Sequence, residues 1–225
     1  DPDGPIITLN GDANINHEAG TLYVDAGASA TDNVDTTVTV ITTGSVDANT
    51  TGTYTLTYHA TDSANNAATP VTRTVVVADT IAPVIILSGD AVMTLALGGT
   101  FTDPGSSVSD GFESGLTATR TGSVNPGALG TYVLRYNVSD SANNAATEVI
   151  RTVVVEDQAE PLITLNGSAT VNHEAGVAYV DAGASATDNV DAAPIVTLID
   201  DSLGDLPLGP NSVGVRVKDA AGNST

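Results

Sequence analysis

The side chains with the greatest capacity for chemistry in this sequence are carboxylates. The 225 residues include 27 acidic and 6 basic side chains, which give a formal net charge of -21. Carboxylate oxygens are preferred ligands of calcium, and a bound cation would offset their mutual repulsion. The alternative interpretation is an acidic surface that water solvates. Nucleic acid and anionic membrane surfaces attract Lys and Arg, so we expect neither as a partner.

Residue types that carry catalysis are scarce. Cys is absent, so neither a disulfide framework nor thiolate chemistry is available. Of the three histidines, His17 and His173 occupy the same position of a repeat, which is typical of a structural role. The sequence has no Gly-rich phosphate loop and no nucleophile elbow, and it lacks the Trp that would stack on a sugar. We therefore expect no enzymatic activity.

The carboxylates recur with a step of 78 residues, which indicates three tandem copies of one unit. The step relates Asp1, Asp79 and Asp157; Asp25, Asp103 and Asp181; Asp32, Asp110 and Asp188; Asp62 and Asp140; and Arg73 and Arg151. The third copy slips by one residue before Asp219. We expect domains at residues 1–78, 79–156 and 157–225, the last of them without a counterpart of residues 73–77.

Hydrophobic alternation predicts the elements that position these groups. Along residues 52–62, Tyr54, Leu56, Tyr58 and Ala60 point to one side, and threonines and His59 point to the other, which is typical of a half-buried strand. Residues 5–9, 22–25, 38–43 and 71–77 predict further strands between turn signals. The fold class we expect is all-β, with tandem immunoglobulin-like Greek-key sandwiches of about seven strands, the third lacking its last strand.

The sequence also resembles a known family. Residues 5–11, 17–20, 23–33, 52–58, 62–66 and 73–77 carry the motifs, among them His-Glu-Ala-Gly and Asp-Ser-Ala-Asn-Asn. These are similar to the Ig-like and HYR-type tandem repeats of bacterial surface proteins. The resemblance implies an array within a large secreted or cell-surface protein, in an extracellular location. No apolar run approaches the roughly 20 residues that a membrane span needs, so we expect no membrane insertion of this segment.

Strand directions assign the carboxylates to the two ends of each domain. The end where the first strand begins, which we call the top, gathers Asp1, Asp3, Asp32, Asp35 and Asp62. The bottom holds Glu18 and Asp79. If the second repeat stacks on the first, the junction adds Asp110, Glu113 and Asp140. This arrangement is similar to cadherin junctions, where calcium makes the linker rigid, and we expect Ca²⁺ here.

The second junction offers a related set of acidic residues: Asp157, Glu160, Asp188, Asp191 and Asp219. The position that matches Glu18 is Ala96, so we expect this cation site to be weaker or built differently. Two nearby positions have other interpretations. Asp25 is expected to bond backbone or to pair with Arg73, and Asn65 is expected to serve a left-handed turn, because Gly222 takes its place in the third copy.

Two functions fit these observations. The first is a structural spacer in a large cell-surface protein, stiffened by calcium at the junctions between neighbouring repeats. The second is an adhesive or self-assembling module that binds a polysaccharide, or like chains in a filament or surface layer. A sandwich without its last strand exposes an unpaired edge, which favours either a truncated sequence or a strand donated by a neighbouring chain. The sequence opens at Asp1 without signal-peptide features, so we expect a piece of a longer protein.

Overall fold

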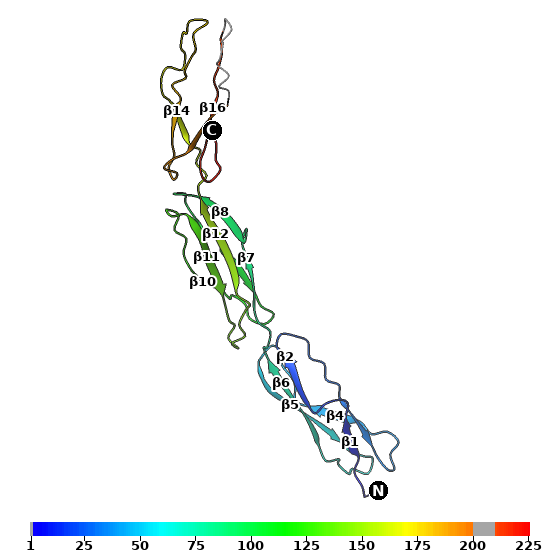
Figure 1. The fold of residues 1–225 in the computed structure, drawn as a ribbon. Coiled ribbons are helices and arrows are strands. Elements are labelled where there is room, and N and C mark those ends of the chain that lie inside the picture. The colour runs from blue at the N-terminus through cyan, green and yellow to red at the C-terminus, as the bar shows by residue number, and fades with distance from the viewer. Residues whose placement is uncertain (1, 200–209) are drawn as a thin grey trace. The chain divides into compact units, whose positions relative to one another are not determined.

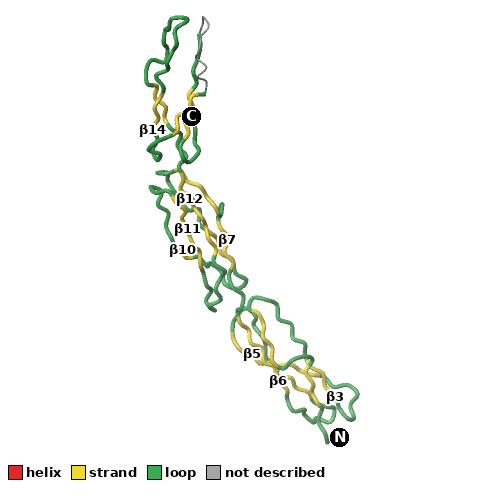
Figure 2. Tube along the Cα trace, in the orientation of Figure 1, coloured by secondary structure: helices red, strands yellow, loops and turns green. Residues whose placement is uncertain are grey.

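The chain forms short β-strands joined by long loops. In the computed structural model, residues 2–199 and 210–225 are described, and they contain sixteen strands and no helix long and apolar enough to cross a membrane (Figures 1 and 2). Contacts divide the chain into two compact units: Asp1–Ser88, Gly105–Arg120 and Tyr136–Val149, and then Gly89–Pro104, Thr121–Arg135 and Ile150–Thr225. No sheet of the described residues combines strands from two of the 78-residue copies.

The first repeat contains six strands in two sheets. They are β1 (Ile6–Leu9), β2 (Asn14–Glu18), β3 (Ala28–Thr31), β4 (Val40–Thr43), β5 (Gly52–Ala60) and β6 (Val71–Ala78). One sheet has the order β2-β6-β5-β4, and the other pairs β1 with β3. β6 runs antiparallel to β5 and parallel to β2, with Val75 opposite Tyr54 and Ile15. Such non-consecutive pairing is typical of a Greek-key sandwich.

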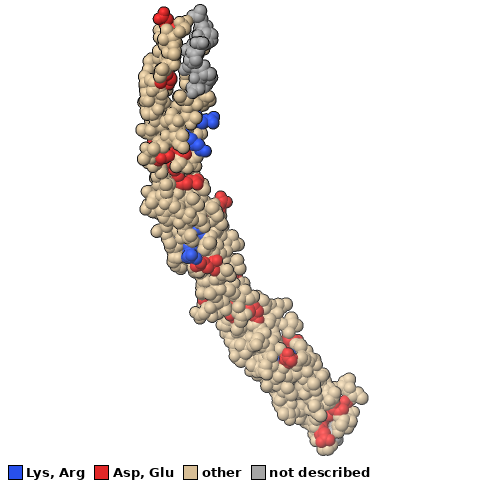
Figure 3. Space-filling model, viewed as in Figure 1, with Lys and Arg blue, Asp and Glu red and all other residues tan. Residues whose placement is uncertain are grey.

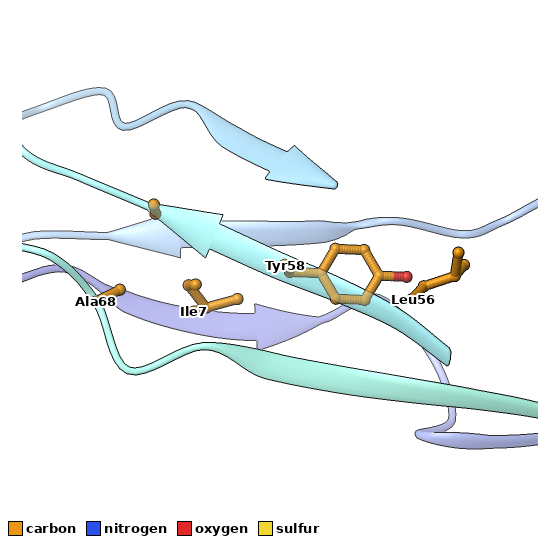
Figure 4. Close-up of a cluster of buried hydrophobic side chains, with 5 residues drawn as sticks. Ile7, Leu56, Tyr58 and Ala68 are labelled. Carbon is orange, nitrogen blue, oxygen red and sulfur yellow. The ribbon is translucent and has the colours of Figure 1, made fainter. Parts of the chain in front are cut away.

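The core of the first repeat follows the alternation of β5. Leu56, Tyr58 and Ala60 are buried and pack with Ile7 and Ala68 (Figure 4). A second buried cluster joins Val75 and Val77 of β6 to Ala19. Each domain has little apolar area to bury, so its polar end groups matter to its stability.

The second repeat has the same set of strands: β7 (Val84–Leu87), β8 (Val92–Ala96), β9 (Ser106–Ser109), β10 (Thr119–Thr121), β11 (Gly130–Asn137) and β12 (Val149–Glu156). Its sheets are β10-β11-β12-β8 and β7-β9. The third repeat has four described strands: β13 (Leu162–Leu165), β14 (Ala184–Thr187), β15 (Ile195–Leu198) and β16 (Val215–Lys218). These form two separate pairs, β13-β14 and β15-β16, and none is a counterpart of β6 or β2.

The all-β sandwich fold with a partial third copy is confirmed, but the strand positions need two corrections. Residues 22–25 are not a strand, and Leu22 is 87% exposed there. Each of the first two copies has six strands. Two strands of the first copy, Asn14–Glu18 and Ala28–Thr31, were not predicted. Both are short and polar, and the first is strand only because it pairs with the distant β6. Local strand propensity does not depend on such a distant partner, so it could not predict this strand. The exact domain boundaries stay predictions.

Candidate cation sites at the repeat starts

Three aspartates at each repeat start follow the ends of strands. Asp79 comes directly after β6, Asp110 after β9, and Asp140 lies three residues beyond β11. In the third repeat Asp157 follows β12, Asp188 follows β14, and Asp219 follows β16. β6 and β12 belong to the preceding repeat and lead directly into the next one, where each linker aspartate meets the loops that carry the other two. Carboxylates are spread over the visible face, where basic groups are few (Figure 3).

The middle aspartate of each set is held by the loop that follows it. Oδ1 of Asp110 accepts hydrogen bonds from the backbone N–H groups of Phe112 and Glu113, both at 2.8 Å. Asp32 and Asp188 make the same pair of bonds two and three residues on. Those bonds lower the pKa of Asp32 and of Asp188. In all three, Oδ2 is buried and has no hydrogen-bond partner. One oxygen is fixed, and the other is free to bind a cation.

The last aspartate closes a tight loop. Oδ1 of Asp140 accepts from the backbone N–H of Asn144, and Oδ2 accepts from its side-chain amide, both at 2.8 Å. The same amide donates to the backbone carbonyl of Asp79 at 3.1 Å. Asn223 ties Asp219 to Asp157 in the same way. The loop turns through Asn143 at φ 70°, as Asn65 does at 69° and Gly222 at 101°, which confirms the left-handed turn.

The linker aspartate of the first set is buried without compensation. Asp79 is 7% exposed, and neither of its carboxylate oxygens has a hydrogen-bond partner. Burial raises the pKa of Asp79, and the charges of Asp110 and Asp140 raise it further. A buried, unpaired carboxylate beside two others is costly unless a cation neutralises it.

The second set brings its oxygens to the spacing that a cation requires. Asp157, Asp188 and Asp219 each place one carboxylate oxygen within 4.8 Å of the other two. Calcium binds oxygens at about 2.3–2.6 Å, so ligands of one ion lie within about twice that distance of each other. Oδ1 of Asp157 also accepts from the Ala159 backbone N–H at 3.1 Å. Among the described residues this set alone gathers three such atoms.

The other predicted ligands use their carboxylates to join loops. Glu18 accepts hydrogen bonds from the backbone N–H and the hydroxyl of Thr80. Three other carboxylates each accept a hydrogen bond from the backbone N–H of the residue after the last aspartate of their repeat. Asp35 accepts from Ser63, Glu113 from Ser141, and Asp191 from Ala220. Asp3 accepts from Asn33, Asp62 is held by Asn66, and Glu160 is exposed. Asp1 lies outside the described residues.

Sequence reasoning missed the groups that organise these aspartates. Thr80, Asn144 and Asn223 were not singled out, although Asn144 and Asn223 hold the last aspartate to the linker. A signal existed: Asn66, Asn144 and Asn223 are the same residue in all three copies, whereas the position before them changes from Asn to Gly.

Asp25 has the structural role that was expected of it. It forms an ion pair with the buried Arg73 and accepts hydrogen bonds from Tyr58 at 2.8 Å and from the Gly27 backbone at 3.1 Å. Burial works against the charge of Asp25, but the bonds from Tyr58 and Arg73 outweigh it and lower its pKa. Arg151 and Asp103 form the equivalent pair. These aspartates are therefore already neutralised by protein cations.

Comparison with known proteins identifies the family of this chain. The model of the family described as "Bacterial surface protein, Ig-like domain" matches residues 7–77 and 85–155. A curated relative, an uncharacterized 81.3 kDa protein of Acholeplasma phage L2, is 35% identical over 130 residues, which cover 52% of this chain and 17% of that protein. The crystal structure of the lipoprotein BT2262 from Bacteroides thetaiotaomicron is 20% identical, with a TM-score of 0.29, over 65% of this chain and 98% of that one. The two family matches cover more than half of the residues, so the chain belongs to the bacterial surface Ig-like domain family.

Proposed function

We propose that this chain is a structural spacer at a bacterial cell surface, and that Ca²⁺ bound at the starts of its second and third repeats fixes the linkers. Asp79 carries the proposal, because both of its carboxylate oxygens are buried without a hydrogen bond. Native proteins rarely leave such a group unsatisfied, and a bound ion is one of the few explanations. The family is one of surface proteins, which supports the location.

The chemistry of the ligands selects calcium. Asp79, Asp110 and Asp140 offer oxygen atoms alone, as do Asp157, Asp188 and Asp219, and the sequence has no Cys. Hard cations prefer such oxygens, and calcium accepts six to eight of them in irregular geometry. Magnesium demands a near-ideal octahedron and gives up its water reluctantly. Backbone carbonyls and water would complete the shell around three carboxylates.

The positions of the ligands along the chain explain how an ion would stiffen the array. Asp79 belongs to the segment between β6 and β7, whereas Asp110 and Asp140 belong to loops of the second repeat. One ion shared by these three residues ties the linker to the domain that follows it. Without the ion, three negative charges repel each other and the linker is released. The spacer function requires that this connection be firm.

Calorimetric titration of the chelator-treated chain tests the proposal. We expect saturable calcium binding at no fewer than two sites, and a rise in melting temperature that magnesium at the same concentration does not reproduce. Asp110→Asn should remove one site. Asp90→Asn makes the same change of charge at an exposed aspartate and should remove none. No heat on titration, together with unchanged melting in chelator, would favour the solvated acidic surface instead.

Adhesion stays a prediction of the sequence. Binding to a glycan, like the absence of catalysis, needs direct assay, and a glycan array is the appropriate measurement for the former. A spacer should bind none of the array's sugars.

A further inference from the structure

The loop that carries Asp110 is tied to its own repeat through polar groups. The carboxylate of Asp110 accepts hydrogen bonds from the backbone N–H groups of Phe112 and Glu113, both at 2.8 Å. The Glu113 carboxylate in turn accepts a bond at 2.7 Å from the backbone N–H of Ser141, the residue after Asp140. Two of the three aspartates of the first set therefore lie in loops that are joined to each other within the second repeat.

The side chain of Phe112 contacts the first repeat instead. It packs against a cluster of the first repeat whose members are at most 3% exposed: Ala19, Val75 and Val77. The backbone of the same loop also comes close. A methyl group at Gly20 would lie 3.2 Å from the Gly111 carbonyl oxygen and 3.4 Å from the Phe112 ring, closer than the roughly 3.5–4.0 Å of a relaxed contact. The first repeat therefore holds this loop from the side opposite to its polar bonds.

The same two segments meet again at the candidate ion site. β6 supplies two residues of the buried cluster and ends at Ala78, and Asp79 follows directly. Asp79 is buried with both carboxylate oxygens unpartnered, and the charge of Asp110 is close enough to raise its pKa. Asp110 and Phe112 are two residues apart in one loop. The segment that leads out of the first repeat and this loop of the second therefore meet twice, through an apolar contact and through two carboxylates.

The described residues show no such close approach at the second linker. Val190 takes the place of Phe112 in the third repeat and is 39% exposed. Gly98 takes the place of Gly20 and has the same φ of 76°, but nothing in the described part of the chain lies within 4 Å of a methyl group placed there. The two linkers thus supply a matched pair, one with the aromatic contact and one without it.

We propose that Phe112 is a positioning residue for the calcium site of the first linker, and that through it the folded first repeat sets the calcium affinity of that site. The inference rests on the proposed function, because it requires an ion at Asp79, Asp110 and Asp140. With the ring packed on the cluster, Asp110 is held near the linker before the ion arrives, so less order has to be imposed on binding. Such coupling is reciprocal, and calcium at this site stabilises the packed ring to the same extent.

Calorimetric titration of the full chain with variants at matched positions tests the proposal. Phe112→Ala should raise the calcium Kd of one site about tenfold, within the usual range for coupled sites, and leave the other site unchanged. Combination with Asp188→Asn, which removes the site of the third repeat, identifies the site that has changed. Val190→Ala truncates the matching side chain and should change neither Kd. Phe112→Leu keeps an apolar side chain on the cluster and should retain most of the affinity.

Hydrogen exchange supplies a readout that a purely structural role would not move. In the wild type, saturating calcium should slow exchange in residues 74–78 of the first repeat. Phe112→Ala should abolish that slowing even at calcium concentrations that fill the site. Gly20→Ala disturbs the same contact from the first repeat and should weaken calcium binding at the first linker. Gly98→Ala carries the same backbone strain without a neighbouring loop and should leave calcium binding unchanged.

The possible failures of the two proposals are distinct. Absence of calcium binding by the wild type refutes the proposed function and this inference together. A wild type that binds calcium, with the same affinities in Phe112→Ala, refutes this inference alone and leaves the ring a packing group. Equal losses at both sites in Phe112→Ala also refute it, because general destabilisation then explains them. If Phe112→Ala does not fold, the comparison of Gly20→Ala with Gly98→Ala decides, and equal calcium affinities in those two variants overturn the proposal.

Discussion

The starts of the second and third repeats carry matching aspartates but differ in the other contacts that hold their linkers. At the first, Glu18 binds Thr80, and Phe112 packs against the cluster of Ala19, Val75 and Val77. At the second, the positions of Glu18, Thr80 and Phe112 hold Ala96, Gln158 and Val190. Gln158 donates instead to Glu156, two residues away. Both linkers receive an amide bond, from Asn144 at the first and from Asn223 at the second, and the first has the Glu18–Thr80 bonds in addition.

This difference changes the reason for expecting a weaker second ion site. That expectation counted Glu18 as a ligand, but its carboxylate is bonded to Thr80. The substitution by Ala96 therefore removes a protein contact and leaves the three aspartates of the site in place. Under our proposal the second linker depends on calcium more completely than the first.

Removal of calcium should produce the largest difference between the two linkers. A ligand at 100 times its Kd stabilises the folded state by about 3 kcal/mol per site. In chelator we expect hydrogen exchange to accelerate more in residues 157–161 than in residues 79–83, and the third repeat to melt first. Differential scanning calorimetry combined with hydrogen exchange measures both. An equal response of the two linkers would contradict the greater dependence of the second linker on calcium.

The effect of substituting a linker aspartate on the stability of the chain should change sign when calcium is added. Asp79→Asn removes a buried charge that has no partner, so in chelator it should stabilise the chain by about 1–3 kcal/mol. With calcium present it removes a ligand and should destabilise. Asp157→Asn should show a smaller gain in chelator, because Asp157 already accepts a bond from Ala159. Urea denaturation in the two buffers supplies the values, and destabilisation by Asp79→Asn in both would contradict the prediction.

The direct contact at the first linker should contribute less. Glu18→Ala removes the two bonds to Thr80 and should cost about 1 kcal/mol in chelator, with faster exchange at residues 79–81. The reciprocal graft, Ala96→Glu with Gln158→Thr, should slow exchange at residues 157–159. Calcium affinity should change little in either variant. A large loss of calcium affinity in Glu18→Ala would mean that Glu18 is a calcium ligand.

The sequence predicted the architecture better than the site, for a physical reason. Repeat spacing and the alternation of β5 depend on side-chain type alone, and both describe the fold correctly. A bond to backbone or a pair with Arg73 was expected for Asp25, and the structure has both. The roles of the acidic residues could not be read in this way. Glu18 and Asp79 are both acidic and were placed at the same end, yet one is hydrogen-bonded to Thr80 and the other is buried without a partner. Only tertiary contacts separate them.

High pH gives the smallest and most selective test, because it distinguishes failure of the first linker from failure of the repeat that precedes it. Burial raises the pKa of Tyr58 to about 12, aided by its hydrogen bond to Asp25, against about 10 in an unfolded chain. The raised pKa favours the neutral phenol, so its contribution to stability is complete below pH 10 and is lost as pH rises through 12. Val215 occupies this place in the third repeat, while Tyr23 and Tyr179 have raised pKa values in the first and third repeats alike.

We therefore expect alkaline titration to destabilise the first repeat more than the third, and Tyr58→Phe to flatten that dependence although it lowers stability at neutral pH. Phenolate absorbance gives the titration, and hydrogen exchange at residues 79–81 reports the linker. If the linker opens at the same pH in wild type and in Tyr58→Phe, its own contacts fail independently of the core. If opening moves to higher pH in the variant, the Glu18–Thr80 contact depends on an intact first repeat, and the advantage of the first linker over the second originates in the core behind it.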